Sequence, residues 1–548
     1  MSQQQQTSSI SVPVLVIGAG PTGLMMASEL ARLGITCRVI DKAAETSPLS
    51  KALAIHARTL EIFENIGIAD GFVTRGVKAH GGSIYSNGKR IVHFFFNALD
   101  SRYKYALMLP QNETEALLNS HLERLGVKVE RSTELTKITQ DAEGITASLR
   151  RPDGSEENCR AAYLVGCDGA HSTVRHALNL TFEGAEYPDV FALADIMVDT
   201  TLPDDEIIGF ANGKGLVFFF PISPGRYRLM ADVPPPEPKG APTVPELQAI
   251  IDEQCHVPAR LHDPNWTAYF TIHRRQATSY RVGRAFLAGD AAHIHSPAGG
   301  QGMNTGLQDA YNLAWKLAAS LKGIVTPAVL DSYAAERHEV GRQVLKMTDT
   351  MTRLIELRNP VVTAIRDRII STLGSAEIFQ NAAGRQMSEL DVNFRDSPIV
   401  GEYHEGILGA FAAFGGPRAG DRAPDADGLQ VGGVPRRLFD LLQGDNHKLL
   451  LFAAGHDAGE LALLGVIAKQ VADQHGKYVA IYAVTNANAA AIPGYQGDTI
   501  IDSAGRLHRA YQAASAGAYL IRPDGYIAYR SFPPNVEHLA KFLAGIFI

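Results

Sequence analysis

A strand, a glycine-rich turn and a helix follow one another near the start of the chain, and this order constrains the fold more than any other feature. Val12–Ile17 is an apolar, largely β-branched run of strand length, and Thr22–Leu33 follows helical spacing. Three glycines separate the two segments at the spacing G-x-G-x-x-G, namely Gly18, Gly20 and Gly23. That spacing lets the backbone turn tightly, approach a pyrophosphate and place the helix N-terminus against the phosphate charge.

A carboxylate completes this pattern. The next predicted strand, Cys37–Ile40, ends at Asp41, about 20 residues beyond the glycines, where an acidic side chain can accept the hydroxyl groups of a ribose. Pro21, Thr22 and Lys42 flank the turn and the acid, and we include them among the candidate contacts. The segment predicts a βαβ unit that binds a dinucleotide, and the alternative is an accidental glycine turn in an ordinary βαβ unit.

A second turn of the same kind follows residue 280. Arg284–Ala288 is a short apolar strand, and Gly289-Asp290 comes where it ends, so the carboxylate would project from the carboxyl edge of a sheet. Glycines at 299, 300 and 302 then open a helix that we expect to run from Met303 to Leu321. Such a helix start presents bare N–H groups and about half a unit of positive charge. A dinucleotide held by the first turn could therefore place a redox ring at the second.

A third turn lies between these two, in "YLVGCDGAHSTVR". The segment predicts a strand over Tyr163–Cys167, a turn at Asp168-Gly169, and a helix that carries Arg175 with Ser172 as its N-cap. Taken alone, a DG pair is usually only a turn. Because this turn occurs together with the other two, Asp168 is a further candidate contact to the same ligand.

The composition argues against several other classes of protein. The chain has 548 residues, enough for two or three domains, and a net charge of −7 without a Lys/Arg cluster, which argues against nucleic acid as a partner. Four widely spaced cysteines form no metal or disulfide pattern, which fits a reducing cytoplasm. No apolar run is long enough to span a bilayer, and residues 1–11 predict a disordered leader.

In order and spacing, the three signatures resemble those of the class A flavoprotein monooxygenases. The motifs are Gly18-x-Gly20-x-x-Gly23 with Asp41, then Asp168-Gly169, then Gly289-Asp290 followed by "HSPAGGQGMNTGLQDA". Para-hydroxybenzoate hydroxylase, phenol hydroxylase, and the polyketide and rifampicin hydroxylases are members of this family. The resemblance covers roughly residues 12 to 345 and implies a bound FAD.

The resemblance also implies which residues contact the FAD. Asp290 would bind the ribityl chain, Gln111 looks like the family glutamine that touches the FAD, and Arg58 belongs to the helix beside the flavin. The residues that would line the isoalloxazine ring are Pro297, Gly300, Gly302, Met303 and Asn304, of which the first three are the candidate catalytic residues. Lys51 stands where many members have arginine, and it keeps the charge without the planar two-pronged donor.

The activity that the resemblance implies is hydroxylation of a phenolic or polycyclic aromatic substrate with NAD(P)H and O₂. In this family O₂ adds at the C4a carbon of the reduced flavin, and the hydroperoxide transfers one oxygen atom to the ring. The chain contains a single G-x-G-x-x-G, so NADPH or NADH would bind transiently over the same flavin. Two alternatives stay open: Baeyer-Villiger-type or antibiotic-inactivating oxygenation on this fold, and a catalytically silent flavin-binding sensor or partner protein.

The middle of the chain predicts a second kind of domain. Alternating strands such as "GLVFFFPI" and "RYRLMADV", and a hairpin turn at Asn87-Gly88, indicate an antiparallel sheet that would cover the flavin. The side chains that could line a substrate pocket in it are Phe191, Phe218, Phe220 and Met230. An ordinary hydrophobic core is the alternative for each of them.

The predicted fold class is α/β with three domains. A Rossmann-like FAD-binding domain with a mixed sheet takes residues 12–82, 106–182 and 280–400, and the antiparallel-sheet substrate domain takes 83–105 and 183–279. Residues 415–548 resemble the thioredoxin-like C-terminal domain of the phenol hydroxylase subgroup. This segment has no cysteine, which excludes thiol exchange, and we expect it to serve packing or contact in a homodimer.

One pair of histidines invites a different interpretation. His293 and His295 form an H-x-H pair that could chelate a metal ion. No third ligand of suitable spacing stands nearby, and the family pattern commonly has histidine here. We therefore predict no metal.

Overall fold

The chain divides into two compact units. The structure is a computed structural model that describes residues 11–47, 50, 52–211, 215–233, 240–295, 299–355, 384–404, 415–453, 457–486 and 491–548. Unit 1 contains Met1–Glu61, Ile68–Ala310 and Arg337–Leu390. Unit 2 contains Ile62–Gly67, Tyr311–Glu336 and Asp391–Ile548. Within the described residues, no helix combines the length and apolarity that a bilayer crossing requires.

Four parallel strands of unit 1 bring the three predicted turns together. The strand β1 (Val12–Ile17) lies between β2 (Cys37–Ile40) and β11 (Glu156–Gly166), and β18 (Ala285–Leu287) pairs with the far side of β11. The helix α1 (Pro21–Arg32) connects β1 to β2. Since all these strands run in one direction, the turns after β1, β11 and β18 lie at the same sheet edge.

The rest of this sheet is mixed, as predicted. Its strand order is β17-β18-β11-β1-β2-β8, and β10 pairs with both β11 and β9. The first half of β11 pairs antiparallel with β10, which explains why β11 begins before the predicted Tyr163. The further strands of the sheet are β8 (Val129–Glu130), β9 (Glu134–Gln140), β10 (Ile145–Arg150) and β17 (Arg281–Val282).

Helices and a small sheet surround this core. A separate antiparallel sheet has the order β3 (Ala54–Ile55), β7 (Ala106–Met108) and β4 (Val77–Ala79). The helical elements are α2 (Ala57–Asn65), α3 (Ala69–Val73), α4 (Gln111–Arg124), α5 (Thr173–Ala177), the 3₁₀ turn η1 (Gly289–Ala291), α7 (Gly302–Leu321) and α8 (Pro327–Ile355). The predicted start of α7 differs from the observed one by a single residue.

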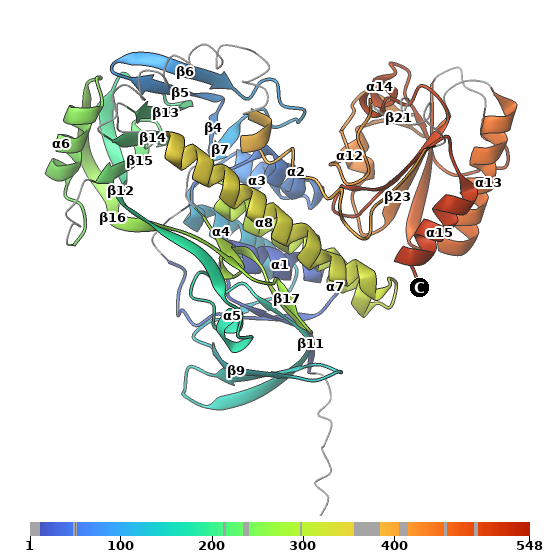
Figure 1. Ribbon diagram of the computed structural model, residues 1–548, viewed down its shortest axis with the longest axis horizontal. Coiled ribbons are helices and arrows are strands. Elements are labelled where there is room, and N and C mark those ends of the chain that lie inside the picture. Colours follow the sequence, from blue (N-terminus) through green and yellow to red (C-terminus); the bar gives the residue numbers. More distant parts are fainter. Residues whose placement is uncertain are drawn as a thin grey trace, which may run out of the picture. The chain divides into compact units, whose positions relative to one another are not determined.

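The second sheet of unit 1 has two different faces. Its strands, in spatial order, are β19 (His293–Ile294), β16 (Ala259–Ala277), β12 (Phe182–Thr200), β15 (Arg226–Val233), β14 (Leu216–Ser223), β13 (Glu206–Ala211), β5 (Gly81–Ser86) and β6 (Lys89–Phe95). The helix α6 (Val244–Gln254) packs on one face through Leu247 and Ile251, beside Ala192, Phe219 and other core residues (Figure 1). Because side chains alternate along a strand, their neighbours Phe191 and Phe218 belong to a second apolar cluster.

The sheet departs from the antiparallel prediction at one pair of strands. β13 and β5 are parallel, whereas the other pairs are antiparallel. These two strands come from distant parts of the chain, so no tight turn dictates their direction. The predicted hairpin turn is confirmed, since Asn87 and Gly88 join β5 to β6 with φ angles of 47° and 75°.

Unit 2 contains a mixed sheet with helices, as expected for an α/β domain. The strands, in spatial order, are β20 (Gly401–His404), β27 (Ile527–Phe532), β26 (Gly517–Ile521), β23 (His447–Ala453), β24 (Val479–Thr485), β25 (Thr499–Ile501), β21 (Leu429–Val431) and β22 (Val434–Arg436). The helices are α12 (Leu438–Leu441), α13 (Ala458–His475), α14 (Arg506–Tyr511) and α15 (Val536–Ile546). α13 and α15 lie side by side (Figure 1). A hairpin joins β26 to β27, with Gly525 at φ 80° in its turn.

A buried cluster of charges lies at this hairpin. Glu336 accepts from Lys316 Nζ at 2.6 Å and from Arg522 Nη1 at 2.6 Å, and Arg522 also donates to Asp524 at 2.5 Å. All four side chains are buried. Burial lowers the pKa of Lys316 to about 8, although Glu336 opposes that shift. The cluster alternates positive and negative groups, and it holds the end of α7 and the start of α8 to the hairpin within unit 2.

This cluster generates a stability prediction. Replacing Glu336 with glutamine leaves Lys316 and Arg522 buried with one counter-charge fewer, and we expect the free energy of unfolding of unit 2 to fall by about 3–5 kcal/mol. The exposed pair Lys469–Asp473 on α13 is the matched control, since Asp473→Asn should cost less than about 0.5 kcal/mol. Urea unfolding followed by circular dichroism measures both. Equal losses of unfolding free energy in the two variants would contradict a stabilising role of the buried charge cluster.

Candidate functional site

The turn after β1 uses its glycines for two different purposes. Gly18 has φ 97°, and a Cβ there would lie 2.4 Å from the carbonyl oxygen of Cys167. A Cβ on Gly23 would lie 1.9 Å from the oxygen of Gly18. Both glycines are thus required by close backbone packing. Gly20 differs, since a Cβ there would meet nothing within 4 Å, so the space beside it is open to a ligand.

The helix α1 starts in the manner of an anion site. Pro21 occupies its first turn, no side chain caps its N-terminus, and no acidic residue lies in that turn. The first N–H groups and the helix dipole are therefore directed at the open space beside Gly20. Asp41, at the end of β2, accepts from Ala19 N at 2.7 Å and from Ala43 N at 2.8 Å, and Lys42 beside it is exposed. These bonds hold a carboxylate next to the turn, as the sequence predicted.

The turn after β18 packs directly against α1. Gly289 has φ 61°, and a Cβ on it would lie 2.5 Å from Thr22 Oγ1. Gly306 on α7 approaches the same hydroxyl, because its Cβ would also lie 2.5 Å away. Asp290 is exposed although its neighbours Gly289 and Ala291 are buried, so its carboxylate faces outward at this edge. Thr22 therefore joins the first and second predicted turns into one site.

Asp309 on α7 fixes the turn after β18. Its Oδ2 accepts from Gly289 N at 2.9 Å and from His293 Nε2 at 2.7 Å, and its Oδ1 accepts from Arg337 Nε at 2.6 Å. Burial acts to raise the pKa of Asp309, but Arg337 and His293 outweigh it and hold that pKa below its usual range. His293 thus serves as a hydrogen-bond partner of Asp309, and in the described part of the chain no three His, Cys, Asp or Glu side chains gather as metal ligands.

The turn after β11 connects to the same edge through an arginine. Ser172 caps α5, as predicted, by accepting from Arg175 N at 3.0 Å. Asp168 accepts from Ser172 Oγ at 2.6 Å and from Val174 N at 3.2 Å, so its carboxylate first of all holds this turn together. Burial raises the pKa of Asp168. Arg175 then donates to the carbonyl of Ala291 at 3.0 Å and links the third turn to the second.

The turn that leads into α7 has a conformation that requires glycine. Gly299 and Gly300 have φ 88° and 65°. His56 Nε2 lies 2.7 Å from the Gly299 oxygen, and because a carbonyl only accepts, this ring nitrogen carries the hydrogen. Burial lowers the pKa of His56 to about 4, so the ring is neutral. The Asn304 amide bonds to His56 N at 2.9 Å and to the oxygen of Ala54 at 2.8 Å.

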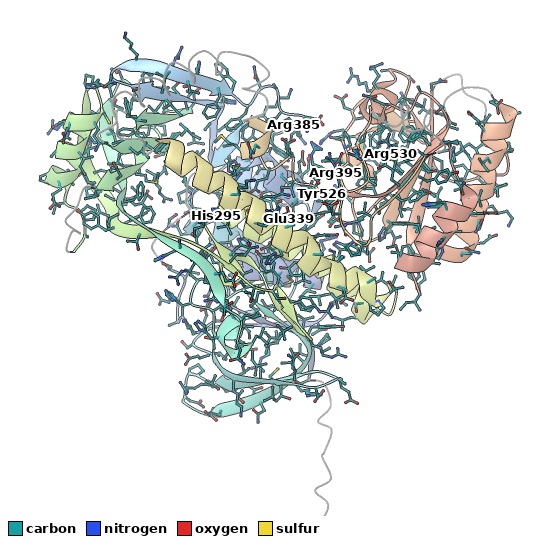
Figure 2. All side chains as sticks on the ribbon, in the orientation of Figure 1. His295, Glu339, Arg385, Arg395, Tyr526 and Arg530 are labelled. Atoms are coloured by element: carbon teal, nitrogen blue, oxygen red, sulfur yellow. The ribbon has the colours of Figure 1, made fainter. Side chains whose placement is uncertain are left out.

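The other predicted FAD contacts that the structure describes lie at the start of α7, near Ala52 and in α2. Gly302 and Met303 begin α7. A Cβ on Gly302 would lie 3.6 Å from Nε2 of His295, which is labelled in Figure 2. Gln111 Oε1 accepts from Ala52 N at 3.1 Å. The Arg58 side chain is buried and donates to Glu61 at 3.1 Å. Lys51 and Pro297 lie outside the described residues.

The four predicted pocket residues gather on one face of the second sheet. Phe191 and Met230 are buried there, and Phe218 and Phe220, whose rings stack with centroids 5.8 Å apart, are partly buried beside them with Trp266. We call this group, on the face away from α6, the aromatic face. Its polar end was not predicted from the sequence.

A buried ion pair ends the aromatic face. Arg228 binds both oxygens of Asp195, at 2.7 and 2.9 Å, and Trp266 Nε1 donates to Asp195 at 3.1 Å. Arg228 also donates to the Ala52 oxygen at 3.0 Å, so the pair joins the aromatic face to the segment that leads to His56. The signal for Asp195 was its position as the single acid within the apolar run 191–198, whereas Arg228 lies close to Arg226 and Asp232 and gives no such signal.

A flavin dinucleotide fits the residues that are present. The open space beside Gly20 and the uncapped start of α1 suit a pyrophosphate, and the Asp41 carboxylate suits a ribose. The exposed carboxylate of Asp290 lies at the same edge, next to the start of α7. The Ala54 side chain and the neutral His56 ring beside Gly300 suit a flat redox ring.

Comparison with known proteins decides the family. The FAD binding domain model matches residues 11–348, and the C-terminal domain model of aromatic-ring hydroxylases matches residues 416–547. The chain belongs to the FAD-dependent aromatic monooxygenases. Pentachlorophenol 4-monooxygenase of Sphingobium chlorophenolicum is 34% identical over 530 residues, which are 95% of this chain and 94% of that one.

Solved structures of this family agree over almost the whole chain. An anhydrotetracycline hydroxylase from Streptomyces rimosus has a TM-score of 0.76 at 32% identity, covering 98% of this chain and 99% of that one. Aklavinone-11 hydroxylase, in a ternary complex with FAD and aklavinone, has a TM-score of 0.73 at 25% identity and covers 97% and 98%. The predicted family, fold class and FAD cofactor are confirmed, and NAD(P)H is the reductant typical of this monooxygenase family. The alternative functions are not favoured.

The two kinds of glycine in the first turn can be told apart by experiment. Gly20→Ala should leave the melting temperature of the FAD-free monooxygenase unchanged, because the methyl group meets no protein atom, but should weaken FAD binding at least about tenfold. Gly23→Ala should lower the stability of the FAD-free protein by about 1–3 kcal/mol through overpacking. Flavin fluorescence titration and thermal unfolding measure the two effects. Wild-type FAD affinity in Gly20→Ala would show that the pyrophosphate does not use this space.

Proposed function

We propose that this monooxygenase hydroxylates a phenolic or polycyclic aromatic compound at the aromatic face. The observation that carries the proposal is the link between the start of α7 and the aromatic face. Asn304 at the start of α7 accepts from His56 N, Ala52 lies four residues before His56 in the chain, and Arg228 joins Ala52 to the aromatic face. Large flat apolar side chains beside a buried polar pair suit a ring that carries hydroxyl groups.

The roles of the site residues belong to this proposal. Gly18, Gly20, Pro21, Thr22 and Gly23 would hold the pyrophosphate at the start of α1. The residues for the rest of the FAD are Asp41, Lys42, Lys51, Arg58, Gln111, Asp168, Gly289, Asp290, Pro297, Gly300, Gly302, Met303 and Asn304. When bound, FAD supplies the redox chemistry by taking a hydride from NADPH or NADH and activating O₂. The chain's own work is to orient the ring and to exclude water.

The domain division and the assembly are proposed as well. We assign FAD binding to residues 12–82, 106–182 and 280–400, substrate binding to 83–105 and 183–279, and packing or homodimer contact to 415–548. The four cysteines are all buried free thiols, which supports the proposed reducing cytoplasm. The predicted leader at residues 1–11 falls, apart from Ser11, outside the described residues.

Turnover with defined compounds tests the proposed activity. Purified protein should be yellow, and a panel of phenols and polycyclic phenols should contain compounds that accelerate NADPH oxidation and yield products heavier by one oxygen atom. Mass spectrometry and NMR of the product identify the reaction, since a ring hydroxyl supports the proposal and a lactone contradicts it. A yellow protein that no member of a broad panel stimulates would contradict the oxygenase assignment.

Two adjacent phenylalanines test the aromatic face. Phe218 lies on that face, and Phe219 lies on the opposite face under α6. Phe218→Ala should raise the KM for the aromatic substrate about tenfold because it removes contact area, with little effect on FAD affinity. Phe219→Ala should instead lower the free energy of unfolding by about 3–5 kcal/mol. If Phe218→Ala destabilises the protein and leaves KM unchanged, the aromatic face is ordinary core.

A further inference from the structure

A buried carboxyl group lies against the first turns of α7. It belongs to Glu389, in the segment 384–390 that carries Arg385, labelled in Figure 2. The segment is tied to the flavin region, because the Ser388 oxygen accepts from Arg58 N at 3.2 Å and the Gln386 oxygen accepts from Gln301 Nε2 at 3.1 Å.

The backbone of Glu389 is strained. The residue is 4% exposed and has φ 59°, a conformation that disfavours any residue with a Cβ. A strained and buried acid persists only where the surrounding structure holds it in place. The contacts of its two carboxyl oxygens show what holds it.

These contacts are all satisfied in one protonation state. Thr305 Oγ1 lies 3.0 Å from the Gln301 oxygen and 3.0 Å from Glu389 Oε1. The hydroxyl has one hydrogen, whereas a carbonyl and a carboxylate can only accept. When Thr305 donates to Gln301, four residues earlier in the helix, Oε1 must carry a hydrogen and donate to Thr305. Oε2 accepts from Gln308 Nε2 at the same time. With Glu389 neutral, all three contacts are hydrogen bonds, whereas with Glu389 ionised the Thr305 hydroxyl can donate to only one of its two oxygen neighbours, and the Gln301 oxygen keeps its bond from Thr305 N at 2.8 Å.

The surrounding charges favour the same state. Burial raises the pKa of Glu389 from 4.5 to about 8, against the hydrogen bonds from Thr305 and Gln308 and the positive charge of Arg337. Arg337 is already bound to Asp309, whose negative charge also raises the pKa of Glu389. The charged groups on the elements around the carboxyl are Arg58, Glu61, His293, Asp309, Arg337 and Arg385.

We propose that Glu389 is a positioning residue that stays protonated at neutral pH and so keeps negative charge away from the first turns of α7. The start of a helix carries about half a unit of positive charge, and a carboxylate bound to Thr305 and Gln308 would cancel it. With Glu389 neutral, that positive charge acts on the flavin ring. The effect on the flavin rests on the proposed function, whereas the protonation state does not.

Infrared spectroscopy of the FAD-free protein tests the protonation state. The difference between wild type and Glu389→Gln at pH 7 should contain the carbonyl band of one protonated carboxylic acid, shifted in D₂O, and the band should disappear as the pH rises past 8. A carboxylate band at pH 7 in its place overturns the proposal. The measurement uses neither substrate nor NADPH, so its outcome is separate from that of the proposed function.

The pH dependence of stability gives a second test. Because the pKa is raised in the folded state, the stability that Glu389 contributes is fully present below pH 4.5 and is lost as the pH rises through about 8. The melting temperature of wild type should therefore fall relative to that of Glu389→Gln across this window. A constant difference between the two proteins overturns the proposal.

FAD affinity tests the consequence for the flavin. If binding raises the pKa of Glu389 by one unit, the Kd for FAD should be roughly fivefold weaker at pH 9 than at pH 7 in the wild type, and unchanged in Glu389→Gln. Glutamine keeps the shape of the neutral acid and its hydrogen bonds to Thr305 and Gln308. If Glu389 had only a structural role, the Kd for FAD would depend on pH in the same way in both proteins. That result would overturn the proposed effect on the flavin. Glu389→Gly, which also relieves the positive φ, is the second variant if glutamine does not fold, and it should be equally insensitive to pH.

Discussion

Close backbone packing at one sheet edge is the constraint on which the rest of the structure depends. Gly18 lies against the carbonyl of Cys167, Gly23 lies against Gly18, and Thr22 fills the space that Gly289 and Gly306 leave open. Side chains at these glycines would push β1, β11, β18 and α7 apart. Because the helices approach the sheet this closely, the starts of α1 and α7 reach the same edge, and two positive helix ends can act on one extended ligand.

The electrostatics of this edge depend on two buried carboxyl groups in opposite states. Asp309 is held ionised by Arg337 and His293, and in that form it accepts from the backbone of Gly289 and fixes the turn. The hydrogen-bond partners of the Glu389 carboxyl among the described residues are the neutral Thr305 and Gln308, and the nearby Arg337 is bound to Asp309. Environments that separate the pKa values of neighbouring acids in this way are typical of sites where charge must be controlled. Asp309 fixes the geometry of the turn after β18, and the neutral Glu389 limits the negative charge at the start of α7.

The sequence predicts the parts of the site that lie on the chain in a fixed order. The strand pattern, the glycine spacing and the acid within residues 12–41 are local features of the chain. The elements β1, α1 and β2 therefore occur where the hydrophobic periodicity predicts them. Contacts between distant segments leave no such local pattern. Arg175 to Ala291, Arg228 to Ala52 and Glu389 to Thr305 each join segments more than 80 residues apart. The local sequence around Arg175, Arg228 and Glu389 does not name these distant partners.

The second sheet shows how one sequence pattern serves two purposes. Strict alternation sends Phe219 under α6 and Phe218 to the opposite face, so the same strand supplies stability on one side and an aromatic surface on the other. The core side is constrained by packing against α6, whereas the aromatic face is constrained mainly at its end, where Arg228 and Asp195 are fixed to Ala52. Substitutions along that face can therefore change its shape without disturbing the core, while the ion pair stays tied to the backbone of Ala52. Under the proposed function, this arrangement separates the residues that determine stability from those that determine specificity.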